Sequence, residues 1–182
     1  MATDVLADPE ELAASLGVQP TDPKLVWALT AASRRFRGAV RHPVSLVAGD
    51  SFVLDGNGRT SILLPAAPVL AVTSVTLDGT ALAEGTDFDW STDGFLRCLC
   101  GVWPDRLRCL RGFYDHGYAV VPEDIQEVVI DQARAMYRID PGVQTKTVGG
   151  QSVTFGVQAA IGVTAQWTAA VERYQLNRGD RP

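Results

Sequence analysis

The stretch RCLRGFYDHGYAVVPEDI (residues 108–125) holds both the end of a strand and the start of a helix. Up to Tyr114 its pattern is that of a strand, and the turn sequence Asp115–Gly117 ends this strand. Pro122 then suits the first turn of a helix, and the two acids that follow it lie at the positive end of the helix dipole. A β region therefore ends here and a helical region begins.

Upstream of this junction, residues 44–118 alternate β-branched and polar residues. The alternation is broken by short turn sequences that bring Asp and Gly together, as in Asp55–Gly58, Asp78-Gly79 and Asp93-Gly94. Such dipeptides are typical of tight hairpin turns. We therefore expect a compact subdomain of short antiparallel strands.

Helical spacing occurs on both sides of this β region. Asp8 and Pro9 suit the N-cap and first turn of a helix over residues 8–16. A longer helix is predicted over residues 22–41, with an apolar stripe at Leu25, Leu29, Ala32, Phe36 and Val40. A third is predicted over residues 122–139, so that helices flank the β subdomain.

The remaining sequence is of two kinds. Residues 144–162 are rich in Gly, Thr and Val and predict a flexible hairpin or an extended arm. Thr164 is suited to cap a last helix. We therefore expect an α+β fold that is mainly α: a small helical bundle with an inserted antiparallel β subdomain over residues 1–142, then an extended C-terminal arm or hairpin and a helix over residues 143–182.

Composition limits the function. The chain has 182 residues, of which 46% are hydrophobic, and this is enough to bury one good core. A net charge of −5 and a pI near 4.9 argue against sequence-independent binding of nucleic acid, which depends on Lys and Arg. The acidic N-terminus is unlike a signal peptide, and no apolar run is long enough to cross a bilayer. We expect a soluble, non-exported protein made in a reducing cytoplasm.

The residues that could carry catalysis are few. Cys98 and Cys100 are too close in sequence to wrap a zinc ion, so buried thiols are expected here and in Cys109, with no metal and no cofactor. His42 and His116 could serve as bases, and a Cys or Ser nucleophile paired with His116 and oriented by the preceding aspartate stays open as an enzyme hypothesis. The sequence therefore favours a protein that binds other proteins over an enzyme.

Two groups of residues are candidates for contact with a partner or with another copy. Arg34, Arg35, Arg37 and Arg41 gather at the end of the second helix, where they form either a solvated face that compensates the dipole or a patch that docks on an acidic surface. The second group lies in the C-terminal region, where the aromatic residues are either core or anchors of a helix-in-groove contact. Its members are Phe155, Trp167, Val171, Arg173, Tyr174, Arg178 and Arg181.

The segment quoted first resembles the phage head-to-tail adaptor family, also described as head-tail connector or head completion proteins. In that family a strand ends in a turn similar to His116–Tyr118, and a helix start similar to Val121–Ile125 follows. Residues 72–79 and 85–88 agree with the same family, and the order of helices, β insertion, helix, arm and helix extends the resemblance over most of the chain.

The resemblance implies a ring of copies, a dodecamer matching the portal's twelve-fold symmetry, in the virion neck. This ring would join the portal protein to head-closure or tail proteins, with the C-terminal segment embracing the portal. Genomic DNA would pass through it without specific binding, no membrane would be involved, and synthesis would occur in the bacterial host cytoplasm. The resemblance brings no catalytic residues. Three alternatives stay open: a head-closure or tail-terminator protein, a small Cys/His-dependent enzyme, and a free interaction module of a host.

Overall fold

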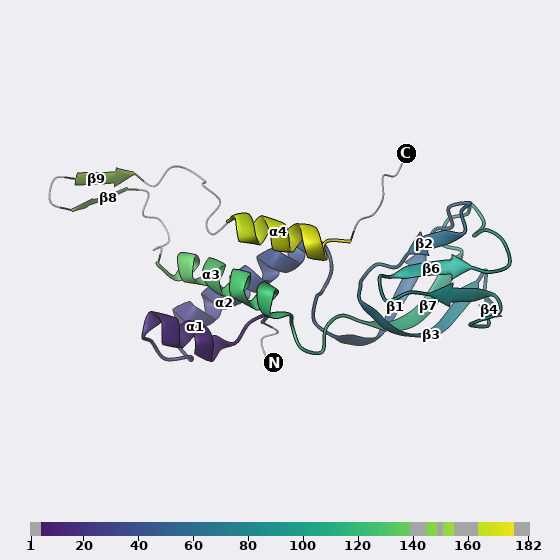
Figure 1. The fold of residues 1–182 in the computed structure, drawn as a ribbon, viewed down its shortest axis with the longest axis horizontal. Coiled ribbons are helices and arrows are strands. Elements are labelled where there is room, and N and C mark those ends of the chain that lie inside the picture. Colours follow the sequence, from purple (N-terminus) through teal and green to yellow (C-terminus); the bar gives the residue numbers. More distant parts are fainter. Residues whose placement is uncertain (1–4, 139–144, 149–150, 155–163, 177–182) are drawn as a thin grey trace. The chain divides into compact units, whose positions relative to one another are not determined.

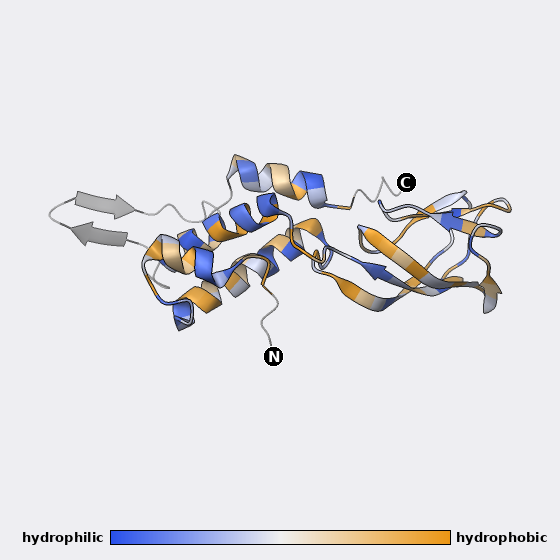
Figure 2. Ribbon diagram, turned by 60° about the horizontal axis from the view of Figure 1, so that its bottom comes forward, coloured by the Kyte–Doolittle hydropathy of each residue, from blue (hydrophilic) through white to orange (hydrophobic). Residues whose placement is uncertain are grey.

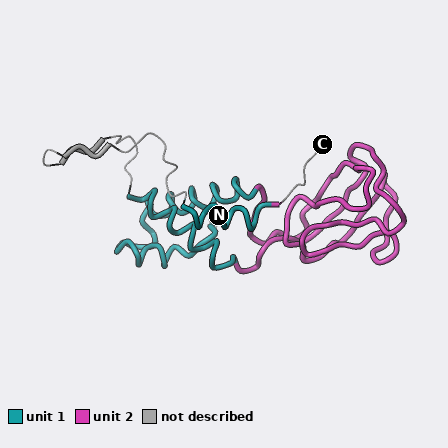
Figure 3. The backbone as a smooth tube through the Cα atoms, turned by 45° about the horizontal axis from the view of Figure 1, so that its top comes forward, with its two compact units in different colours: residues 1–40, 121–175 teal, residues 41–120, 176–182 magenta. Residues whose placement is uncertain are grey.

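The computed structural model describes residues 5–138, 145–148, 151–154 and 164–176 (Figure 1). The chain divides into two compact units, coloured separately in Figure 3. The first consists of Met1–Val40 and Val121–Gln175 and is helical, and the second consists of Arg41–Val120 and Leu176–Pro182 and is built of strands. The β unit is therefore inserted between two helices, as the junction at residues 108–125 predicted.

The helical unit contains α1 (Pro9–Leu16), α2 (Pro23–Val40), α3 (Glu123–Arg138) and α4 (Ala165–Tyr174). The bounds of α1, α2 and α3 lie within one residue of the predicted bounds, and no bounds were predicted for α4. Asp8 caps α1 by accepting a hydrogen bond from the Glu10 amide at 2.9 Å, and Gly17, at φ 69°, ends it. Asp22 caps α2 by accepting from the Lys24 amide at 2.7 Å. Local sequence signals thus set where these helices begin and end.

The helices bury their apolar faces against one another, and their hydrophobic and hydrophilic residues separate into different sides in Figure 2. Leu25, Leu29 and Phe36 of α2 are at most 1% exposed, as are Ile125 and Val129 of α3. Burying a side chain of this size contributes roughly 1.5–3 kcal/mol to folding. In α2 the buried residues include the whole apolar stripe that the sequence identified.

The β unit contains two antiparallel sheets that share one core. The larger has the strand order β1-β7-β3-β4, and the smaller the order β2-β6-β5. Their bounds are β1 (Val47–Leu54), β2 (Ser61–Leu63), β3 (Val69–Leu77), β4 (Thr80–Leu82), β5 (Phe88–Trp90), β6 (Phe95–Cys98) and β7 (Leu110–His116). Phe52, Val75 and Tyr114 of the larger sheet and Phe88 and Leu96 of the smaller one belong to one buried cluster.

Two glycines show why these strands can pair as they do. Asp78 and Gly79, at φ 51° and 85°, form the tight turn between β3 and β4 and bring Leu77 opposite Thr80. Gly112, at the centre of β7, has no room for a side chain, because an added Cβ would lie 2.1 Å from the Ser74 carbonyl oxygen. The α+β prediction, with an inserted antiparallel β subdomain, is confirmed.

The described part of the C-terminal region consists of a helix and a hairpin. Helix α4 belongs to the same compact unit as α1, α2 and α3. Between α3 and α4, β8 (Thr145–Val148) and β9 (Gln151–Thr154) pair as an antiparallel hairpin, in the stretch where a hairpin or arm was expected. No helix of the described residues is long and apolar enough to span a membrane.

Candidate interaction surfaces

The arginines at the end of α2 are not equivalent. Arg34 and Arg35 are exposed and Arg37 is half-buried, while Arg41 follows the last helical residue at φ 66°. Arg35 and Arg37 already have interactions within the chain. Arg34 and Arg41 are exposed and make no hydrogen bond or ion pair in the described part of the chain, so the charge of each is available for a partner, Arg34 on the helix and Arg41 just beyond its end.

Helix α4 is held to the bundle near both of its ends. Trp167, in its first turn, is only 5% exposed, and its ring meets Phe36 edge to face at a centroid distance of 5.3 Å. Near the other end, the Tyr174 hydroxyl donates to Asp124 at 2.8 Å, and Arg173 donates to the same carboxylate at 3.0 Å. Thr164 caps the helix by accepting from the Trp167 amide at 3.1 Å.

These contacts separate the predicted C-terminal residues. Trp167 is part of the core of the helical unit, which agrees with the core alternative kept open for it, and a contact role for it stays a prediction. Val171 is half-buried. The side chain of Arg173 is 68% exposed although it pairs with Asp124 of α3. Phe155, Arg178 and Arg181 lie outside the described residues.

His116 and Cys109 do not form the catalytic pair considered from the sequence. His116 is fully buried at one end of β7, with its Nε2 3.0 Å from Asp50 Oδ2, whereas Cys109 lies beyond the other end of that strand. At about 3.3 Å per residue the strand separates these two residues by about 23 Å. Asp115, expected to orient the histidine, instead accepts from the Gly49 amide at 2.6 Å.

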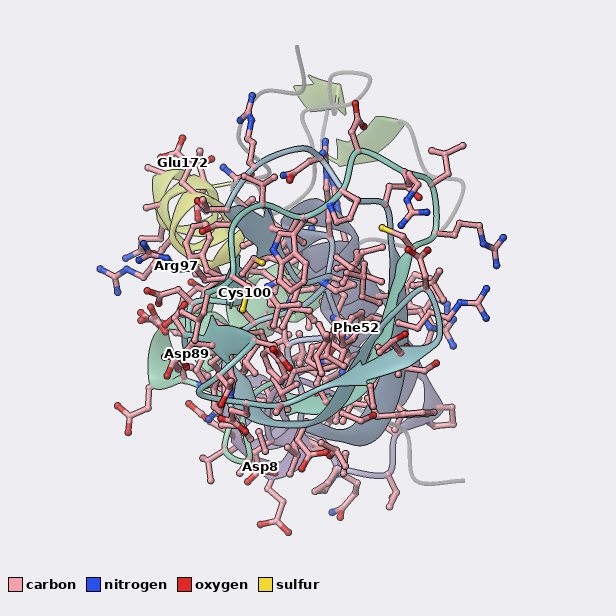
Figure 4. All side chains as sticks on the ribbon, turned by 90° about the vertical axis from the view of Figure 1, so that its right-hand side faces the viewer. Asp8, Phe52, Asp89, Arg97, Cys100 and Glu172 are labelled. Atoms are coloured by element: carbon pink, nitrogen blue, oxygen red, sulfur yellow. The ribbon has the colours of Figure 1, made fainter. Side chains whose placement is uncertain are left out.

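The cysteines and Tyr114 were also compared with what a catalytic or metal site requires. The expectation of buried thiols is confirmed for Cys109, but Cys98 is half-buried and Cys100, labelled in Figure 4, is exposed, with its Sγ 3.5 Å from the Thr86 carbonyl oxygen. The phenol of Tyr114 lies beside the ring of His116, and burial, followed by the Asp50 carboxylate, raises the pKa of Tyr114 to about 12. Within the described ranges, no group of three or more His, Cys, Asp or Glu side chains could hold a metal ion.

Two tryptophans were missed by the sequence reasoning. Trp27 on α2 is 55% exposed, although α2 buries most of its other large apolar residues. A signal was present, because Trp27 falls between Leu25 and Leu29 and so lies off the apolar stripe of the helix. Trp103 lies in the loop between β6 and β7, yet it is fully buried, and its indole N–H donates to the Leu96 carbonyl at 3.1 Å.

Comparison with known proteins decides the family. The model of the Head completion protein family matches residues 11–175, which include both units. The chain belongs to the head completion protein family. This head completion protein is therefore a structural component of the virion, as the resemblance at residues 108–125 implied. No protein with a curated description matches its sequence significantly.

Solved structures show that the fold of this head completion protein is shared. It matches a chain in the neck of a native gene transfer agent (GTA) particle computed with C12 symmetry, with a TM-score of 0.55 and 21% identity, over 100% of this chain and 97% of that one. A chain in the neck of an empty GTA particle computed with C6 symmetry gives 0.54 and 20%, over 97% and 94%. A chain in the virion of a native GTA particle gives 0.59 and 19%, also over 97% and 94%. At these identities the likeness concerns the fold.

Proposed function

We propose that this head completion protein is the head-to-tail adaptor, whose copies form a ring in the virion neck between the portal and the head-closure or tail proteins. The observation that carries the proposal is the match of the whole fold to neck subunits of GTA particles. The match includes the β insertion as well as the helices, because it covers 97–100% of this chain. Those necks were computed with C12 and C6 symmetry, which supports a cyclic ring of copies.

The charge of the protein supports a passive relation to DNA. A net charge of −5 leaves little capacity to neutralise phosphates, so genomic DNA would pass along a ring of these subunits without being held. Membership in a structural family, together with the separation of His116 from Cys109 along β7, supports a role without catalysis. Synthesis in the bacterial host cytoplasm and assembly into the neck complete the proposal.

We place the portal contact in the C-terminal segment, residues 143–182. Within it, α4 uses Trp167 and Tyr174 to hold itself on the bundle, so the surface left for a partner is its solvent side. Gln166, Thr168, Ala169, Glu172 and Arg173 are exposed there. These residues, rather than the buried tryptophan, are the side chains of α4 to alter in a test of portal contact.

The experiment mixes the purified chain with the portal protein of the same genome and images the product by electron microscopy. A truncation after Gly142 is a poor variant, because it also removes Trp167 and uncovers Phe36. A better variant replaces residues 144–162 by a Gly/Ser linker of equal length and keeps α4. The proposal predicts a ring on the tail-side end of the portal with the wild-type chain and weakened attachment with the linker variant. A wild-type chain that stays apart from the portal under all salt conditions would refute it.

A further inference from the structure

Helix α2 has an exposed face that the described chain leaves uncovered. Trp27, Arg34 and Gly38 are exposed, and spacings of seven and eleven residues place the last two on the same side of the helix as Trp27. Trp27 and Arg34 make no hydrogen bond or ion pair in the described residues. A Cβ added at Gly38 would meet nothing within 4 Å. We call this surface the Trp27 face.

The composition of the Trp27 face is that of a protein contact. A single exposed apolar side chain is ordinary on a protein surface. Here, however, an exposed tryptophan shares one face with an available arginine, and these two residue types are the most enriched among the residues that dominate interface energies. Gly38 has no side chain, which leaves room on this face for close approach of a partner. The face is therefore suited to a partner with an apolar pocket and negative charge.

Helix α3 carries the complementary charge. Glu123 and Glu127 are exposed and lie one turn apart on one side of the helix. Neither makes an ion pair in the part of the chain that the structure describes. The nearby Asp124 is different, because Arg173 and Tyr174 already occupy its carboxylate. We call the surface formed by Glu123 and Glu127 the Glu127 face.

The two faces look away from each other. Helices α2 and α3 pack together, and each buries the side opposite to its exposed face: α2 buries Leu29 and Phe36, and α3 buries Ile125 and Val129. The Trp27 face and the Glu127 face therefore cannot meet within one copy. They can meet between copies, and two different surfaces on opposite sides of a subunit are what a head-to-tail ring requires.

We infer that the Trp27 face of one copy docks on the Glu127 face of the next copy in the ring. Trp27 supplies the apolar anchor, and Arg34 pairs with the glutamates across the contact. The inference rests on the proposed ring and adds which helices form it, α2 on one side and α3 on the other. It is independent of the portal contact, which we place in the C-terminal segment.

The test measures association between copies of the full chain, by sedimentation velocity over a concentration series and by counting copies bound per portal. Trp27→Ala should weaken each contact between copies by about 30-fold or more, as expected for an aromatic hot spot. Arg34→Glu and Glu127→Arg should each weaken it by about tenfold or more, because each sets like charges against each other. Arg59→Glu, an exposed charge reversal in the β unit, is the matched control and should assemble like the wild type.

The charge reversals also provide a rescue. In an equal mixture of Arg34→Glu and Glu127→Arg chains, a ring in which the two variants alternate has either a natural or an exchanged ion pair at each contact. The mixture should therefore assemble more readily than either variant alone. Circular dichroism on each variant checks that its helices are intact. Rings of Trp27→Ala and Arg34→Glu chains that form as readily as wild-type rings would overturn the inference, and so would a mixture that stays as inert as its components.

Failure of the inference and failure of the proposed function give different results. If the wild-type chain associates with itself but does not bind the portal, the portal proposal fails and the Trp27 contact is still measured. If the wild-type chain binds the portal and the variants fill the ring equally well, only the Trp27 contact fails. A wild-type chain that associates neither alone nor on the portal overturns both.

Discussion

Replacing Trp167 by alanine is expected to release α4 from the helical bundle. The tryptophan is 5% exposed and meets Phe36 edge to face at 5.3 Å, so the substitution removes a large buried side chain and leaves a cavity beside Phe36. Truncations of this kind cost about 3–5 kcal/mol. Helix α4 has only ten residues, and a helix of this length is not stable in water without its packing.

Hydrogen–deuterium exchange followed by mass spectrometry measures this effect directly. At 1.4 kcal/mol for each factor of ten, the amides of residues 164–176 should exchange about a hundred to a few thousand times faster, or reach the rate of an open chain. Peptides from the β unit should be unaffected, because α4 belongs to the helical unit. Trp27→Ala is the control, since it removes the same side chain from a position that is 55% exposed and should change exchange in α4 very little.

One result would refute this reasoning. If Trp167→Ala leaves exchange in residues 164–176 at the wild-type rate while the protein stays folded, then Trp167 does not hold α4, and the C-terminal helix is not part of the bundle core. Equal effects of the two tryptophan substitutions would also contradict it, because the argument depends on the difference in their burial.

Three further predictions concern other parts of the chain. Gly112→Ala should lower the unfolding free energy of the β unit by about 1–3 kcal/mol in a denaturant titration, because its Cβ would lie 2.1 Å from a carbonyl oxygen. Gly38→Ala is the matched control in α2: its Cβ would meet nothing within 4 Å, so it should raise the unfolding free energy by about 0.5–1 kcal/mol. Folding raises the pKa of Tyr114 from 10.0 to about 12, so the unfolded chain loses the phenol proton at lower pH than the folded chain does. The contribution of Tyr114 to the free energy of unfolding should therefore be fully present below pH 10 and should fall as the pH rises to 12. The same pH titration of Tyr114→Phe should show a smaller fall. Tyr174→Phe should speed exchange in the last turn of α4 by about tenfold, because it removes a hydrogen bond to the Asp124 carboxylate, and unchanged exchange there would argue against that contact.

Local signals account for the part of the fold that the sequence predicted. Asp8, Gly17 and Asp22 fix helix ends by hydrogen bonds and backbone angles that depend on a few neighbouring residues. Asp78-Gly79 fixes the β3–β4 hairpin in the same way, because both residues adopt positive φ. Such features need no knowledge of distant parts of the chain, and they appeared where the sequence indicated.

Long-range packing accounts for what could not be predicted. The strand order β1-β7-β3-β4 puts the first and last long strands of the β unit side by side, and no local pattern specifies this pairing. Trp103 is buried although it lies in a loop, because it fills the core between two sheets that come together only in the fold. The spacing of Trp167 and Tyr174 placed them on one face of α4 but could not say that Phe36 and Asp124 would be their partners.

The candidate surface shows the same limit. The four arginines at the end of α2 are equivalent by sequence, yet the fold engages Arg35 and Arg37 and leaves Arg34 and Arg41 available. The off-stripe position of Trp27 indicated that it could be exposed, but only the fold shows that no other part of the described chain covers it. A surface is defined by what the rest of the chain does not cover, and this depends on tertiary structure.

A cryo-electron microscopy reconstruction of the neck of the intact particle tests most directly whether this chain is the adaptor. We expect a ring of this chain directly below the portal, with helices α1–α4 and the two sheets of the β unit each fitting the density of every subunit. Density for the chain at the head-closure or tail-terminator position, away from the portal, would contradict the adaptor assignment, and so would a neck in which the chain is absent.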